Sequence, residues 1–117
     1  MTTRTEEPWR NYRWKDGKRF MVPMETLLER LSQKDIEIVN GVINGNYSDS
    51  SFLVWQKTKV ENILQSLNEG TPVESLPPVE LAYDKSSNRF GVSDGRSRII
   101  AYKIKGVEVL PVKLYRG

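Results

Sequence analysis

The chain has 117 residues, of which 38% are hydrophobic and 28% are charged, and this composition is typical of a single globular domain. It contains no cysteine and no histidine, which excludes disulfides, thiolate nucleophiles, and the commonest metal ligand and general base. No apolar run approaches the roughly 20 residues that span a membrane, and no signal peptide is recognised. We therefore expect a cytoplasmic protein with no membrane partner and no metal site.

The net charge of +3 is unevenly distributed along the chain. Residues 1–20 carry six basic and three acidic side chains, residues 21–83 carry four and nine, and residues 84–117 carry eight and three. Both ends are therefore basic, and the middle is acidic. If the two ends lie on one side of the fold, they form a face that suits a polyanion.

Residues 1–7 have the pattern of a flexible tail, and residues 8–20 then mix aromatic and basic side chains around the turn pair Asp16–Gly17. The turn predicts a hairpin, with Tyr12 and Trp14 on one arm and Arg19 and Met21 on the other. Aromatic rings stack on bases and cations pair with phosphates, so this segment is a candidate nucleic-acid contact. The candidates are Arg10, Arg13, Trp14, Lys15, Lys18 and Arg19.

The alternative for this segment is that its aromatic rings pack onto the domain while its cations are solvated. Two short helices are predicted next. Pro23 suits the start of the first, and Ser32 with Asp35 has the pattern of a weakened capping box for the second. We expect both helices to be structural, as part of an N-terminal addition that acts as a cap or an interface.

The most regular helical pattern follows Thr58, which together with Glu61 forms a full capping-box sequence. Its apolar face recurs at helical spacing, at Val60, Ile63, Leu64 and Leu67, and Gly70 is placed to end it. The short apolar run 52–55 before it is either a strand or an extension that leans on this helix. Three prolines between 71 and 78 then predict an extended connection.

The C-terminal part predicts strand, hairpin, strand, turn, helix and final strand. Residues 78–83 alternate as a strand, residues 84–88 form the hairpin loop, and the next strand leads to the turn pair Asp94–Gly95. A helix then begins at Arg96 and stops at Gly106. A last strand follows, with Pro111 at a position that a strand tolerates only near its start or at a sheet edge.

The start of this last helix is a candidate anion site. The first N–H groups of a helix have no intrahelical partner and carry partial positive charge, and arginine side chains add donors that match phosphate. The candidate residues are Gly95, Arg96, Ser97 and Arg98. The alternative is that Ser97 caps the helix while both arginines face solvent.

Asp94 is the one acid in this motif, and it is a candidate for holding a divalent metal beside a phosphate or for acting as a general base. The alternative is that it makes an Asx turn.

The segment VSDGRSRIIAYKIKGVEVLPVKLY resembles the signature of the ParB/sulfiredoxin-like superfamily, which consists of a strand, an Asp-Gly-x-His/Arg-Arg turn, a helix, a glycine and a strand. The preceding KVENILQSLNEGTPVESLPPVEL has the same order of events as the helix and strand before that signature. The resemblance covers about residues 57–115. It implies an α+β fold with a small mixed sheet and helices packed on it.

Asp94, Gly95 and Arg98 match the motif of the superfamily, whereas Ser97 stands where a histidine or arginine is usual. Sulfiredoxins place their catalytic cysteine at the position of Arg96, so sulfiredoxin chemistry is excluded here. The serine-kinase branch has a histidine-rich version of the loop, which this chain lacks. The shared implication is a phosphate-binding loop used on a nucleotide or on nucleic acid.

We therefore expect one domain, with residues 8–51 as an N-terminal addition and residues 52–117 as a ParB/sulfiredoxin-like core. The favoured function is a phosphate-recognising module that binds DNA or a nucleotide, as plasmid or phage proteins of this type do. The first alternative is a phosphotransferase, hydrolase or nuclease that uses a nucleotide with Mg²⁺ at Asp94. The second is a non-catalytic interaction domain that keeps only the fold. DNA or a nucleotide is the expected partner, and a homodimer is a further option.

Overall fold

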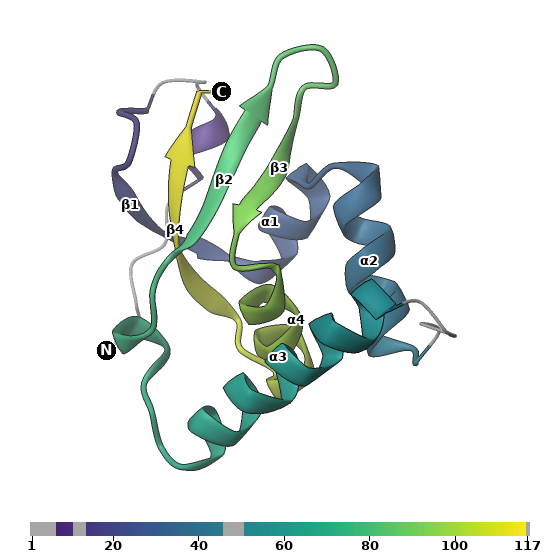
Figure 1. Ribbon diagram of the computed structural model, residues 1–117. Helices are drawn as coiled ribbons and strands as arrows, with labels where there is room; N and C mark the ends of the chain where they lie inside the picture. Colours follow the sequence, from purple (N-terminus) through teal and green to yellow (C-terminus); the bar gives the residue numbers. More distant parts are fainter. Residues whose placement is uncertain (1–6, 11–13, 46–50, 117) are drawn as a thin grey trace.

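The computed structural model describes residues 7–10, 14–45 and 51–116, and these form one four-stranded sheet with helices packed against it (Figure 1). The strands are β1 (Arg19–Pro23), β2 (Val79–Asp84), β3 (Arg89–Asp94) and β4 (Val109–Tyr115). The helices are α1 (Met24–Arg30), α2 (Gln33–Ile43), α3 (Ser51–Asn68) and α4 (Arg96–Lys105), with short 3-10 turns η1 (Pro8–Arg10) and η2 (Val73–Ser75).

The sheet is mixed and has the strand order β1-β4-β2-β3. β2 and β3 form the antiparallel hairpin that the sequence predicts, with Asp84 paired to Arg89 at its closed end. The chain then passes through α4 and returns in β4, which runs parallel to β2, and β1 adds an antiparallel edge to β4. The predicted α+β class with a small mixed sheet is therefore confirmed.

The strands alternate between buried and partly exposed positions, so one face of the sheet carries the core. Val79 and Leu81 of β2 are fully buried, as are Val112 and Leu114, their register partners in β4. Ile99 and Ile100 of α4 are also fully buried in the same cluster. α4 thus packs on the sheet by its apolar side, and this packing fixes where its first turn lies.

Pro111 is the third residue of β4, which is an interior strand, so of the two predicted options the sheet edge does not hold. Its position is nevertheless near the start of the inner ladder, because the pairing of β4 with β2 begins one residue later, at Val112 with Val79. On the other side Pro111 stands opposite Met21. The missing N–H therefore precedes the parallel ladder and does not interrupt it.

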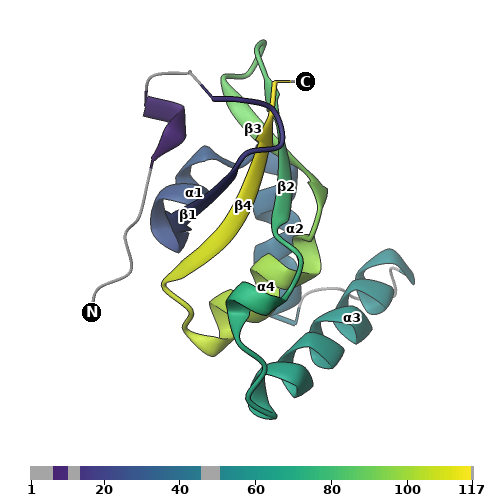
Figure 2. The same ribbon diagram turned by 90° about the vertical axis from the view of Figure 1, so that its left-hand side faces the viewer.

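α3 is one continuous helix from Ser51 to Asn68, so the predicted start at Thr58 is wrong. The Thr58 and Glu61 pattern lies within the helix, and the run before it is its first turns. The predicted end is confirmed, since Gly70 has a positive φ of 96° and Thr71 N donates back to Ser66 O. α3 packs mainly against α4 and extends away from β1 (Figures 1 and 2).

Residues before α3 are built into the same sheet and core as those after it. β1 pairs with β4 along five residues, and Leu31 bridges to Phe90 at the free edge of β3. The predicted hairpin around Asp16–Gly17 is only partly testable, because Tyr12 lies outside the described residues. The turn is present, but β1 takes β4 as its partner, and Gly17 N donates to Leu114 O. The expected boundary between 51 and 52 falls in the first turn of α3.

The Tyr102 hydroxyl is buried in the core and has no hydrogen-bond partner among the described residues. Burial raises the pKa of Tyr102 above its usual value of 10.0, with the Arg98 charge opposing this shift. The folded state therefore favours the neutral phenol, so its contribution to stability is present below about pH 10 and is lost as the pH rises further.

We expect Tyr102→Phe to unfold at the same temperature or higher, with a free energy of unfolding raised by up to about 1 kcal/mol. The reason is that the substitution removes a buried hydroxyl whose desolvation is not offset by a hydrogen bond. Thermal unfolding at pH 7 and at about pH 11 measures both effects, and the variant should lose less stability between the two. A clear destabilisation at pH 7 would mean that the hydroxyl makes a stabilising contact.

Within the described parts of the chain, no helix has both the length and the apolar content needed to cross a membrane.

Candidate phosphate-binding site

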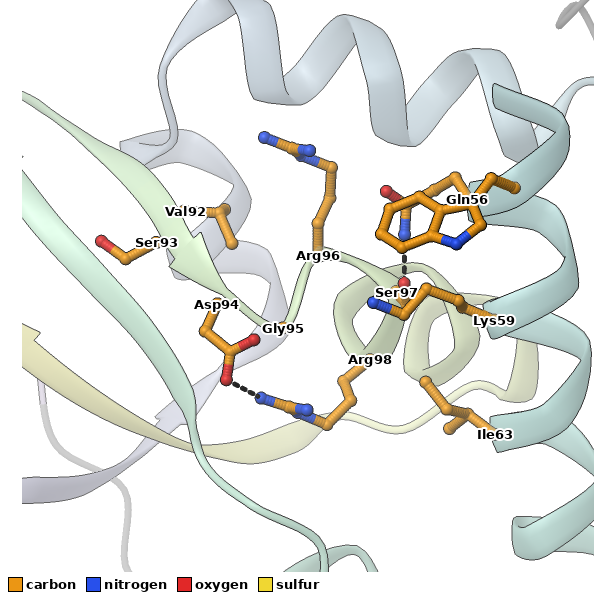
Figure 3. A pocket seen from close by; sticks show the side chains of 11 residues that line it. Gln56, Lys59, Ile63, Val92, Ser93, Asp94, Gly95, Arg96, Ser97 and Arg98 are labelled. Atoms are coloured by element: carbon orange, nitrogen blue, oxygen red, sulfur yellow. Dashed lines mark hydrogen bonds and ion pairs between the residues drawn. The ribbon is translucent and has the colours of Figure 1, made fainter. Parts of the chain in front are cut away.

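A pocket with a volume of about 230 Å³ lies where β3 ends and α4 begins, with α3 forming its opposite wall (Figure 3). All the predicted residues of the phosphate loop line it, together with a group of residues from α3. The lining residues are Trp55, Gln56, Lys59, Ile63, Val92, Ser93, Asp94, Gly95, Arg96, Ser97 and Arg98. The structure therefore brings the sequence motif to a concave surface.

The first turn of α4 opens toward this pocket without a side-chain cap. Gly95 is the N-cap residue, has φ 102° and ψ 18°, and makes no side-chain cap hydrogen bond. The first backbone hydrogen bond of the helix runs from Ile99 N to Gly95 O. The amides of Arg96, Ser97 and Arg98 therefore have no intrahelical acceptor. The alternative in which Ser97 caps the helix is not what the structure has.

Gly95 is required both by its backbone and by its surroundings. A Cβ at this position would lie 2.8 Å from Arg98 Nη2 and 3.1 Å from Val79 Cγ2. We expect Gly95→Ala to lose about 2 kcal/mol or more, because a left-handed backbone cost adds to this crowding. The new methyl group also displaces the Arg98 guanidinium.

Gly70→Ala is the matched control for this prediction, since Gly70 has φ 96° and its added Cβ would meet nothing within 4 Å. Gly70→Ala should lose only the free energy needed to hold an alanine in the left-handed conformation, about 1–2 kcal/mol. Urea unfolding of both variants measures the difference. Equal losses in the two variants would contradict the crowding at Gly95.

Gln56 and Ser97 form a buried polar contact at the floor of the pocket (Figure 3). Gln56 of α3 is 3% exposed and Ser97 of α4 is 6% exposed, and Gln56 Nε2 donates to Ser97 Oγ. A serine hydroxyl that accepts one hydrogen bond still has its own hydrogen to donate. The contact ties α3 to α4 and sets the orientation of the Ser97 hydroxyl.

Arg96 does not serve the pocket in the way that the sequence suggests. Its Nε and Nη2 donate to Asp35 Oδ1 at 3.0 and 2.7 Å, and the Asp35 side chain is only 5% exposed. In Figure 3 the guanidinium of Arg96 points away from Arg98 and Asp94. Arg96 is therefore a structural residue, and its charge is largely balanced by Asp35.

Asp35 joins three elements at this point. Its Oδ2 accepts from Val92 N at the free edge of β3 and from Ser32 Oγ at the start of α2, while Oδ1 holds Arg96. The predicted capping role of Ser32 is confirmed, since Ser32 Oγ accepts from Asp35 N. This one buried carboxylate thereby connects the edge strand β3, the start of α2 and the first residue of α4 by hydrogen bonds.

Arg98 and Asp94 form an ion pair on the other side of the turn. Arg98 Nη2 donates to Asp94 Oδ2 at 3.1 Å and to Pro78 O at 3.3 Å. The Arg98 side chain is 15% exposed, so the alternative in which both arginines face solvent does not hold for it, whereas Asp94 is 60% exposed. Arg98 Nε is also buried and has no hydrogen-bond partner among the described residues.

Asp94 accepts a hydrogen bond from Arg98, and among the described residues no cluster of three metal-ligating side chains includes it. Asp94 is therefore an exposed partner of Arg98 in the lining of the pocket. A catalytic or metal-positioning role for Asp94 stays a prediction.

None of the pocket residues on α3 was predicted from the sequence as part of a site. Lys59 is exposed and extends toward the start of α4 (Figure 3), with its Nζ 4.2 Å from the centre of the Trp55 ring. Trp55 is 55% exposed. The available signal was helical spacing, because positions 55, 59 and 63 lie on one face of α3 once the helix is known to begin at Ser51.

The aromatic residues of the N-terminal segment belong to the core. Trp14 is 6% exposed and packs its ring against Tyr83 and Phe90 at centroid distances of 5.7 and 5.5 Å. Trp9 is similarly buried against Phe90. A ring that is buried in this way has no face open to a base, which favours the alternative in which the aromatic rings of this segment pack onto the domain.

The cations of that segment lie far from the pocket. Lys15, Lys18 and Arg19 are exposed. Arg19 lies in β1, opposite Lys113 of β4 in the strand register. β1 and β3 are opposite edges of the sheet, three strand spacings of about 4.8 Å apart. The described cations of the N-terminal segment therefore lie beside β1 and β4, away from the end of β3. Arg13 and the side chain of Arg10 lie outside the described residues.

Comparison of the chain with protein-family models, with curated proteins and with solved structures gave no match. The ParB/sulfiredoxin-like assignment therefore continues to stand on the sequence motif alone.

Proposed function

We propose that this chain recognises a phosphate group, carried by a nucleotide or by nucleic acid, in the pocket at the start of α4. The observation that carries the proposal is the convergence of an uncapped helix start, the exposed Lys59 and the buried Ser97 hydroxyl on one pocket. Helix N-termini attract anions through their free N–H groups and partial positive charge.

Each group has a distinct part in binding the anion. The N–H groups of the first turn and the Ser97 hydroxyl supply directional hydrogen bonds. Lys59 supplies a mobile positive charge from the opposite wall of the pocket. Arg98 supplies the third contact, since its guanidinium lines the pocket beside the turn and already donates from Nη2 to the exposed Asp94 carboxylate.

The charge balance of the pocket favours an anion. Three cationic side chains line it against one carboxylate, Asp94, and the further carboxylate of Asp35 lies on Arg96. The Arg98–Asp94 pair contributes little to stability because Asp94 is 60% exposed. A phosphate can therefore take the place of the Asp94 carboxylate on Arg98, at small cost to the fold.

Lys59→Ala provides the cleanest test, because an exposed helix position has an expected stability change within about 0.5 kcal/mol. We expect the variant to bind inorganic triphosphate, nucleoside triphosphates and a short duplex roughly tenfold more weakly than the wild type at low salt. The difference should shrink when the salt concentration is raised, as screening reduces the charge contribution.

Lys57→Ala is the control for charge, since Lys57 lies on the same helix, pairs with Glu61 and does not line the pocket. It should bind as the wild type does. Equal weakening in the two variants would show that net charge alone governs binding, and absence of binding to all three probes would contradict the proposed function. Calorimetric titration of the full chain distinguishes these results.

A further inference from the structure

Among the described residues, Trp55 has the most exposed large hydrophobic side chain. Among the described side chains, the large hydrophobic ones that stay about half exposed are Trp55, at 55%, and Ile104, at 48%. The other two tryptophans, Trp9 and Trp14, are 5% and 6% exposed. Trp55 alone of the two exposed residues lines the pocket at the start of α4.

The size of the pocket shows what it can enclose. Sites that enclose whole small molecules have volumes of about 300–1,000 Å³, whereas this pocket has about 230 Å³. It has room for a phosphate group, but most of a larger ligand must lie outside it. The remainder of such a ligand would then rest on the rim, where Trp55 and Lys59 lie.

The rim has the chemistry of a stacking surface. An indole ring has two broad, flat, electron-rich faces, and the Lys59 ammonium lies over one of them, 4.2 Å from the ring centre. Nucleobases stack on such rings whatever their sequence, because every base has a π-face. Lys59 lies beside the ring and also lines the pocket, so it can contact the phosphate of a nucleotide whose base stacks on Trp55.

We infer that Trp55 stacks on an unpaired nucleobase of the ligand whose phosphate occupies the pocket. This inference rests on the proposed function and makes it narrower. Bases in a duplex have their faces covered by their neighbours, so they cannot stack on an indole without being extruded. The surface therefore selects free nucleotides or single strands over duplex DNA and over phosphate without a base.

The test compares the full-length wild type with Trp55→Leu and Trp55→Phe. Four probes are titrated: inorganic triphosphate, adenosine triphosphate, a short thymidine single strand and a duplex of the same length. We expect Trp55→Leu to bind the nucleotide and the single strand roughly tenfold more weakly, with a much smaller effect on inorganic triphosphate. Trp55→Phe keeps a flat ring and should retain most of the affinity.

Tryptophan fluorescence gives a second readout, since an exposed indole is quenched by a stacked base while the buried Trp9 and Trp14 are not. Equal affinity of the wild type for inorganic triphosphate and for the nucleotide would overturn the stacking role and leave the phosphate site standing. Equal weakening of all four probes by Trp55→Leu would also overturn it. Failure of the wild type to bind any probe would overturn the phosphate site as well.

The titrations with adenosine triphosphate and with the single strand show whether the stacked base belongs to a free nucleotide or to a nucleic acid. Tighter binding of the single strand would assign the surface to nucleic acid, and tighter binding of the nucleotide would assign it to a small ligand. Either result supports stacking by Trp55. Preference for the duplex over both would contradict it.

Discussion

Replacing Asp35 with alanine is expected to destabilise the fold by about 3–5 kcal/mol, the cost of breaking a buried ion pair from one side. The loss leaves Arg96 without its bidentate partner and Val92 N without an acceptor at the edge of β3. It also removes the acceptor of Ser32 Oγ. A change of this size is a large part of the 5–15 kcal/mol that typically stabilises a domain.

Thermal unfolding measures the effect, and the midpoint of Asp35→Ala should fall by more than about 10 °C. Asp35→Asn keeps the shape of the side chain and should also lose stability, because it removes the charge opposite Arg96. Glu37→Ala is the control, since Glu37 is an exposed carboxylate on the same helix whose hydrogen bond is to Gln33. Unchanged midpoints for both Asp35 variants would show that the fold does not depend on this carboxylate.

The second large effect is expected at Arg98, where Arg98→Gln should weaken phosphate binding by about 10- to 100-fold. The reason is that hydrogen bonds to charged groups contribute about 1.5–3 kcal/mol, and glutamine supplies neither the charge nor the forked donors. Arg98→Lys keeps the charge and should recover part of the affinity. Titration with inorganic triphosphate at low salt measures both variants.

Arg98 is mostly buried, so its variants must be compared at known stability. The loss of the bond to Pro78 O and of packed side-chain atoms is expected to cost about 1–2 kcal/mol in Arg98→Gln. Binding is therefore measured well below the unfolding transition of each variant. Wild-type affinity in a folded Arg98→Gln protein would contradict the role of Arg98 at the site.

The local parts of the fold follow from the sequence. The Asp94–Gly95 turn, the helix from Arg96 to a stop at Gly106, and the β2–β3 hairpin depend on residues within a few positions of one another. Glycine at φ > 0 and alternating apolar residues are signals that a single sequence carries. This explains why the motif region and its fold class were predicted correctly.

The site could be only partly predicted, because its partners are distant in sequence. Asp35 and Arg96 are 61 residues apart, and Gln56 and Ser97 are 41 residues apart. A basic residue in a motif looks the same whether it faces solvent or a buried carboxylate. Arg96 was therefore assigned to the ligand, although the structure assigns it to the fold.

The start of α3 shows how a local signal can mislead. Thr58 and Glu61 have the spacing of a capping box, but the helix begins earlier, at Ser51, and packs mainly against α4. Packing of an apolar face contributes more to most helices than capping does. The misplaced start hid Trp55 and Lys59, because they were not seen as parts of one helical face.

The central claim is that the first turn of α4 binds a phosphate group. The most direct measurement is the shift of backbone amide resonances in isotope-labelled full-length protein during titration with inorganic triphosphate. The account predicts saturable shifts concentrated at the amides of Gly95, Arg96, Ser97 and Arg98, with smaller ones near Lys59, and these shifts should weaken as salt is added. Shifts confined to the basic residues around Lys15, Lys18 and Arg19, or no saturable shift in the first turn of α4, would contradict it.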